Sequence, residues 1–175
     1  MPRAWWKGTE QDGGCRTVNG LEVLRRCAAY THDMEKLKSQ KALALDAAVR
    51  ITPGMDTSGG GRSSDISAKP ERFVQAADWL ERRMSARRCM YALELEEAAR
   101  LLEHMEPANA DALRLVMITG LTVRQAAGEM RRSCDAVRGL LSRSRSILKD
   151  TPSRLSDDPD YQDLLRQYSR RFRDG

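Results

Sequence analysis

The chain has 175 residues, of which 41% are hydrophobic and 31% charged, and its formal net charge at pH 7 is +5. This length suits one ordinary domain, or a small domain with helical extensions, and an aromatic content of 5% predicts a modest core. The abundance of Ala, Leu, Glu and Arg favours an all-α fold. We see neither a signal peptide nor an apolar run long enough to span a membrane, so we expect a cytoplasmic protein with no membrane partner.

The first part of the chain is expected to be an irregular arm, a long helix and a linker. Residues 1–20 hold four glycines and lack apolar periodicity, and the pair Trp5-Trp6 is expected to dock on the first helix, with stacking on a partner as the alternative. Residues 21–51 contain no Gly or Pro and predict one long helix, with an interruption near Thr31 as the alternative. Its expected apolar stripe is Leu21, Leu24, Ala28, Leu37, Ala44, Ala48 and Ile51.

A linker is predicted over residues 52–69, where three glycines, 59–61, are flanked by serines. The run lacks a preceding strand and a following Lys-Ser or Lys-Thr, so a nucleotide loop is disfavoured. Residues 70–105 predict a second long helix with Pro70 in its first turn. Its apolar stripe is Phe73, Ala77, Leu80, Met84, Tyr91, Leu95, Ala98, Leu102 and Met105.

We expect the two long helices to pack as an antiparallel pair, or as a coiled coil with a second copy of the chain. The opposite face of the second helix carries two arginine pairs and then three acids. We expect the acids to be solvated and paired at helical spacing, with contact to RNA polymerase or another basic partner as the alternative. The arginines are candidates to extend a phosphate-contacting surface. The residues of this face are Arg82, Arg83, Arg87, Arg88, Glu94, Glu96 and Glu97.

Three shorter helices are predicted over residues 107–150. Pro107 suits the start of the first helix, and Gly120 suits the left-handed residue that ends it. Thr122 is the expected N-cap of a helix to Met130, and Ser133 that of a helix to Lys149. In this last helix the expected inner face is Val137, Leu140, Leu141, Ser144, Ile147 and Leu148, and the outer face is Arg138, Gly139, Ser142, Arg143 and Arg145.

Two short helices joined by a tight turn, the second with a basic outer face, are typical of a helix-turn-helix domain. Ala127 is the small residue expected where the helices touch, and Val137 follows ten positions later on the inner face. Residues 107–149 hold eight Arg or Lys and three acids, whereas the rest of the chain has no net charge. The sequence therefore predicts that double-stranded DNA binds here.

This segment contains the run GLTVRQAAGEMRRSCDAVRGLLSRSRSIL. The run resembles the promoter-reading fourth region of bacterial sigma-70 factors, in which a Thr- or Ser-capped helix, a capped turn and a Val-Arg-x-x-x-x-Arg helix follow in this order. Similar units close the small phage late-gene activators of the RinA and ArpU type, after a helical N-terminal half. The sequence departs from this pattern at Arg131 and Arg132, where a Gly and an apolar residue are usual, and at Gly139, which replaces a polar residue often aimed at a base.

The resemblance implies a sequence-specific transcription regulator of phage or prophage origin, acting in the bacterial host, with RNA polymerase as a further partner. We expect the helix from Ser133 to lie in the major groove, with Arg138 recognising a guanine and Gly139 letting the backbone approach closely. The other candidate base contacts include Cys134, Asp135 and Ser142. The expected phosphate contacts are Arg124, Arg131, Arg132, Arg143 and Arg145.

Two other functions stay open, those of a phage small terminase subunit and of a helical protein–protein adaptor. The sequence contains no nucleophile–base pair, nucleotide loop or set of metal ligands, and its four cysteines lack CxxC spacing, so we expect no enzyme, cofactor or metal. Residues 151–175 are expected to form a tail with a short helix from Tyr161 to Arg173. The inward residues of that helix are predicted to be Leu164, Leu165 and Tyr168.

Overall fold

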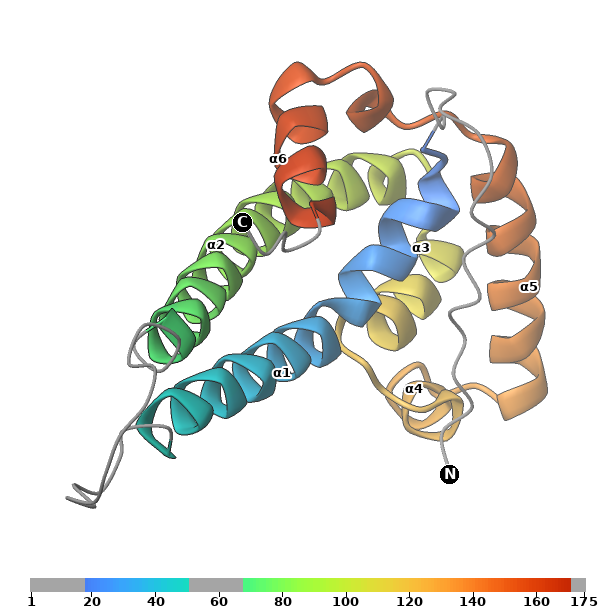
Figure 1. The fold of residues 1–175 in the computed structure, drawn as a ribbon. Helices are drawn as coiled ribbons and strands as arrows, with labels where there is room; N and C mark the ends of the chain where they lie inside the picture. Colours follow the sequence, from blue (N-terminus) through green and yellow to red (C-terminus); the bar gives the residue numbers. More distant parts are fainter. Residues whose placement is uncertain (1–17, 51–67, 171–175) are drawn as a thin grey trace, which may run out of the picture.

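The computed structural model describes residues 18–50 and 68–170, and in these ranges the protein is all-helical (Figure 1). The predicted all-α fold is thus confirmed for the described residues, where the one strand-like feature is a single backbone bridge between Asn19 and Pro152. The arm with Trp5-Trp6, the glycine run of the linker and the basic end 171–173 lie outside the described residues. None of the described helices is long and apolar enough to cross a membrane.

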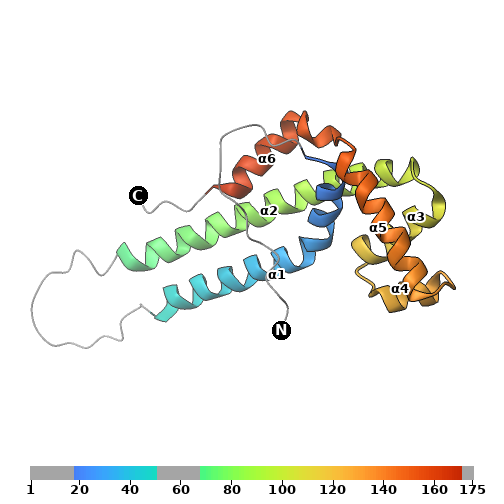
Figure 2. The same cartoon turned by 90° about the vertical axis from the view of Figure 1, so that its right-hand side faces the viewer.

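Two long helices, α1 (Gly20–Arg50) and α2 (Ala68–Glu103), run antiparallel beside each other within the chain (Figure 2). α1 is continuous through Thr31, so the alternative of an interruption there is wrong. Ala28, predicted to face inward, is exposed because α1 turns Cys27 to the core instead. The inward positions of α1 follow three- and four-residue steps through Val23, Cys27, Tyr30, Met34, Leu37 and Lys41.

The inward stripe of α2 also follows these steps, and two of its positions are charged. After Leu80 and Met84 the next inward residue is Arg87, and Glu94 follows seven residues later. Their side chains are 3% and 0% exposed. The prediction that Glu94 and Glu97 are solvated is therefore wrong, and so is the placement of Arg87 on the outer face. All three residues occupy core positions between α1, α2 and the C-terminal segment.

Arg87 and Glu94 form a buried ion pair that is hydrogen-bonded to neighbouring helices. Arg87 Nη1 donates to Glu94 Oε2 at 2.8 Å, while its Nε donates to Asp33 Oδ2 at 3.1 Å. Its Nη2 donates to the main-chain oxygen of Arg26 at 2.7 Å. These three bonds use all three nitrogens of the guanidinium, which satisfies the buried charge.

The second carboxylate oxygen of Glu94 is bonded to α6 (Pro159–Ser169). The hydroxyl of Tyr161 donates to Glu94 Oε1 at 2.8 Å, and Arg26 Nη1 donates to the Tyr161 oxygen at 2.5 Å. Burial is the main cause of a raised pKa for Tyr161, and the Glu94 carboxylate raises it further, so the hydroxyl stays protonated. α6 is thus joined to both long helices through one buried polar network.

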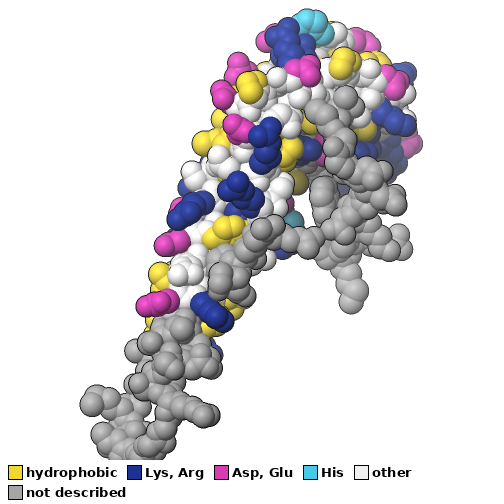
Figure 3. All heavy atoms as spheres, turned by 45° about the horizontal axis from the view of Figure 1, so that its top comes forward, with side chains coloured by type: hydrophobic (Ala, Val, Ile, Leu, Met, Phe, Trp, Pro, Cys, Tyr) yellow, Lys and Arg dark blue, Asp and Glu magenta, His cyan; other side chains and the backbone are white. Residues whose placement is uncertain are grey.

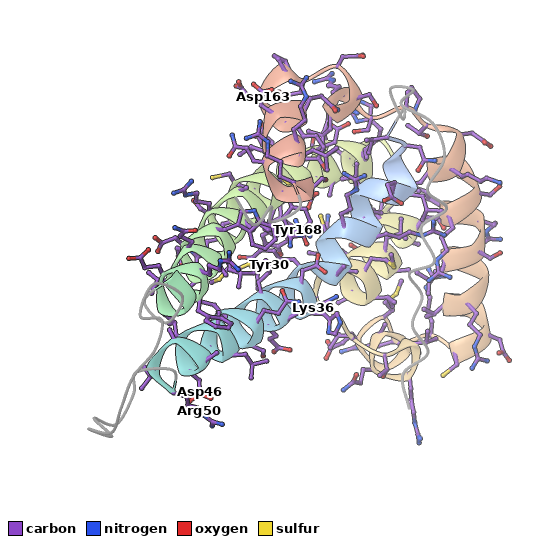
Figure 4. The ribbon with its side chains drawn as sticks, in the orientation of Figure 1. Tyr30, Lys36, Asp46, Arg50, Asp163 and Tyr168 are labelled. Atoms are coloured by element: carbon purple, nitrogen blue, oxygen red, sulfur yellow. The ribbon has the colours of Figure 1, made fainter. Side chains whose placement is uncertain are left out.

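α6 lies across α2 and makes a second contact with it, between Tyr168 on α6 and Arg83 on α2. The guanidinium of Arg83 lies 4.7 Å from the Trp79 ring centroid and 4.8 Å from that of Tyr168. Arg83 Nε also donates to the Tyr168 main-chain oxygen at 2.8 Å. Tyr168 reaches from α6 toward the α1–α2 pair (Figure 4). Tyr168 and Tyr30 both pack against the small buried cluster of Met34, Leu37, Leu80 and Met84. α6 begins earlier than predicted because Asp158 caps it.

The C-terminal half contains α3 (Pro107–Leu113), a π-helical turn (Arg114–Ile118), α4 (Val123–Glu129) and α5 (Cys134–Asp150). A 3-10 turn (Arg154–Ser156) then leads to α6. The end of α5 is fastened to the start of α1, since Gly20 N–H donates to the Thr151 oxygen at 2.9 Å. A Cβ at Gly20 would lie 3.0 Å from the Leu148 side chain, so a larger residue here would require that side chain to shift.

Glu97 connects α2 to the segment after α5. Its carboxylate accepts two hydrogen bonds from Arg100, both at 2.7 Å, and one from the main-chain N–H of Arg154 at 2.9 Å. Burial raises the pKa of Glu97, but the hydrogen bonds from Arg100, Arg154 N–H and Ser153 outweigh this effect and lower it below the usual value.

We predict that Glu94→Ala lowers the free energy of unfolding by about 3–5 kcal/mol, because it removes one partner of a buried ion pair and leaves the other charge incompletely compensated. Urea denaturation at pH 7 measures this. The matched control is Glu96→Ala, an exposed glutamate on the same helix, which should change stability by less than about 0.5 kcal/mol. Equal effects of the two substitutions would show that the buried pair contributes nothing.

We predict that Glu97→Gln flattens the acid limb of the stability–pH profile. A carboxylate whose pKa is lowered in the folded state stabilises the protein above its unfolded pKa of about 4.3, and this contribution is lost as pH falls through the lower folded pKa. Urea midpoints measured from neutral pH down to acid pH give the profile. Glu96→Gln is the control, and a Glu97→Gln profile parallel to that of the parent would contradict the prediction.

Candidate nucleic-acid interface

The starts of α4 and α5 are defined by side-chain caps. Thr122 Oγ1 accepts from the Gln125 N–H at 3.3 Å, and Gln125 Oε1 accepts from the Thr122 N–H at 2.9 Å, which completes a capping box. Ser133 Oγ accepts from the Ala136 N–H at 3.2 Å. Both predicted N-caps are observed, and they fix where each helix begins.

The ends of the preceding helices rely on left-handed residues. Gly120 has φ 74°, as its predicted left-handed role requires. The π-helical turn that precedes it was not predicted from the sequence. α4 ends with Arg131 at φ 51°, the one non-glycine residue with positive φ in the described ranges. The N–H groups of Arg131 and Arg132 donate to the oxygens of Gly128 at 3.1 Å and Ala127 at 2.9 Å, which is a Schellman motif.

The inner sides of α4 and α5 are packed as predicted, with one exception. Ala127 and Val137 are buried, and on α5 so are Leu140, Leu141, Ser144 and Leu148. Ile147 is 53% exposed, so its predicted inward placement is wrong. Ile147 lies at the edge of the stripe, next to the buried Leu148 but on the exposed side.

Exposed basic residues lie on the outer side of α5, in the turn before it and, as Arg124, at the start of α4, and we call this set the α5 surface. Cys134 is only half-exposed and packs against the core. The other predicted contact residues are all exposed, and they are Arg124, Arg131, Arg132, Ser133, Asp135, Arg138, Gly139, Ser142, Arg143 and Arg145. Lys149, which the predicted phosphate set omitted, is also exposed on α5.

Most of the basic groups on this surface are available to a ligand. Within the described residues, no ion pair engages Arg124, Arg131, Arg132 or Arg143. Arg145 Nη2 lies 4.0 Å from the Met117 sulfur. Arg138 differs, because its Nη1 donates to Asp135 Oδ1 at 2.7 Å. This pair was missed in the sequence, although residues three apart on a helix face the same side.

The face of the molecule drawn in Figure 3 carries charges of both signs. Along its elongated part, Lys and Arg side chains are interspersed with Asp and Glu, without a field of one sign. Among the described residues no group of His, Cys, Asp and Glu could hold a metal ion. The α5 surface is therefore the candidate site.

No protein-family model matches the chain, and no match is found among curated proteins or solved structures. The geometry and charge of the α5 surface are therefore what points to a function. The resemblance to the fourth region of sigma factors stays a prediction.

We predict that Arg131→Gly raises the free energy of unfolding by up to about 1 kcal/mol. Glycine removes the penalty of a left-handed residue, about 1–2 kcal/mol, and loses part of this gain through greater freedom of the unfolded chain. Urea denaturation measures the change. Arg132→Gly removes the same charge from a residue without positive φ, so it should not stabilise the protein. A gain shared by both variants would point to charge repulsion instead of backbone strain.

Proposed function

We propose that the protein is a sequence-specific DNA-binding transcription regulator that reads the major groove with α5, as part of a helix-turn-helix domain of the sigma-region-4 type. The observation that carries this proposal is the exposed basic α5 surface on a helix whose opposite side is packed into the core. A helix of this kind fits the major groove of B-DNA.

The placement of the basic residues supports a division of roles. Arg138 lies one turn into α5, where side chains of a recognition helix approach base edges. Arg124, Arg131 and Arg132 precede this turn, and Arg143 follows it, so they flank the base-reading segment. Flanking arginines of this kind bind phosphates and set the register of the protein on the duplex.

The arrangement of the long helices is compatible with DNA approaching α5. In Figure 2 α5 lies toward the viewer while the α1–α2 pair extends away to one side. The two long helices pack their apolar stripes against each other within one chain, which uses the surface that a coiled coil between chains would need. We therefore propose RNA polymerase, rather than a second copy of the chain, as the further partner.

We predict that Arg143→Ala weakens binding to every duplex and reduces the slope of log K against log salt by about 1, because one phosphate contact is lost. Arg138→Ala should instead reduce discrimination at one base pair by about 1–3 kcal/mol. Selection from random-sequence duplexes, followed by fluorescence anisotropy at several salt concentrations, measures both effects. Arg72→Ala, an exposed arginine on α2, is the control and should bind as the parent does.

Three outcomes of the same experiment would redirect the assignment. Absence of duplex binding by the parent at low salt would overturn the proposal and favour a protein–protein adaptor. Duplex binding without sequence selection would overturn specific recognition. A DNA-binding ring of many subunits, measured by light scattering, would favour a small terminase subunit over a transcription regulator.

A further inference from the structure

The first turn of α5 carries an acid within the basic α5 surface. Asp135 is 89% exposed, and its Oδ1 accepts a hydrogen bond from Arg138 Nη1 at 2.7 Å. A carboxylate at this place repels the phosphates that the surrounding arginines would attract, so it opposes duplex binding in general. An effect of Asp135 on the orientation of Arg138 would give a functional reason for an acid at this place.

A purely structural account of this pair is available and can be tested. An acid in the first turn of a helix interacts favourably with the helix dipole, and an exposed pair at i and i+3 adds little stability. Asp163 and Arg166 on α6 form an exposed pair with the same spacing, at 2.9 Å. The α6 pair is therefore a matched reference for what such a pair contributes to structure alone.

Building on the proposed function, we propose that Asp135 is a positioning residue that orients Arg138 toward a guanine in the major groove. Arginine carries five N–H donors on a planar group, and Asp135 engages only Nη1. Within the described residues the Nε and Nη2 groups of Arg138 make no hydrogen bond. They remain available for the O6 and N7 acceptors that guanine presents side by side.

The Asp135–Arg138 pair acts on specificity in two ways. It restricts the rotamers of Arg138 before binding, so less side-chain entropy is lost when guanine is recognised. Its carboxylate also repels DNA, and only a duplex with the guanine offsets this repulsion through its contact with Arg138. Binding to other sequences is therefore weakened. Asp135 thus reduces affinity for DNA in general and increases the preference for one base pair.

The test uses the full chain and the duplex selected by the parent protein. Binding is measured to that duplex, to variants with the guanine pair replaced, and to an unrelated duplex, at several salt concentrations. We expect Asp135→Asn to reduce the preference for guanine by about fivefold or more while binding to the unrelated duplex becomes tighter. A residue that only supported the fold would weaken binding to all duplexes together.

Two further proteins complete the test. Asp163→Asn removes the matched pair on α6 and should change neither the preference nor the affinity. In an Arg138→Ala background, Asp135→Asn should leave the remaining base preference unchanged, because the residue that it orients is absent.

The possible results separate this inference from the proposed function. If the parent selects a sequence and Asp135→Asn keeps the guanine preference, the positioning role is overturned while DNA binding stands. If Asp135→Asn weakens all duplexes equally, the role is structural and the inference is again overturned. If the parent binds no duplex, the proposed function fails, and this inference fails with it.

Discussion

The arrangement of α1, α2 and α6 depends on the buried ion pair between Arg87 and Glu94. Each charge loses its hydration on folding, a penalty of several kcal/mol, which the attraction between the two charges and their further hydrogen bonds must compensate. The compensating groups come from α1, as the Asp33 carboxylate and the Arg26 main-chain oxygen, and from α6, as the Tyr161 hydroxyl. Both residues lie on α2, so sliding α1 or α6 along it would keep the ion pair but break the hydrogen bonds from Asp33, Arg26 and Tyr161. The pair therefore selects one register of three helices.

The same scaffold determines where α5 lies. Glu97 of α2 holds the segment that follows α5, and Gly20 at the start of α1 is packed against Leu148 near the end of α5. α3 and α4 complete the support from the other side. A helix held at both ends by packed neighbours keeps its outer side chains in a defined place, as recognition of a rigid duplex requires.

One residue of the α5 surface departs from local rules of stability. Arg131 adopts a left-handed conformation that glycine adopts more readily. Departures of this kind concentrate at functional sites, where binding outweighs local stability. In the proposed function Arg131 adds a positive charge to the turn, and Asp135 makes the surface selective.

The limits of the helices in the C-terminal half could be predicted from the sequence, because caps and turns depend on residues within one or two helical turns. The residues concerned are Pro107, Gly120, Thr122 and Ser133. The basic outer side of α5 followed from the same short-range periodicity. The burial of a side chain could not be predicted where it depends on the residues that a distant helix places against it. Arg87 and Glu94 are solvated in any isolated helix and become core residues only because α1 and α6 supply partners, whereas Ile147 is exposed because no described helix covers that edge of α5.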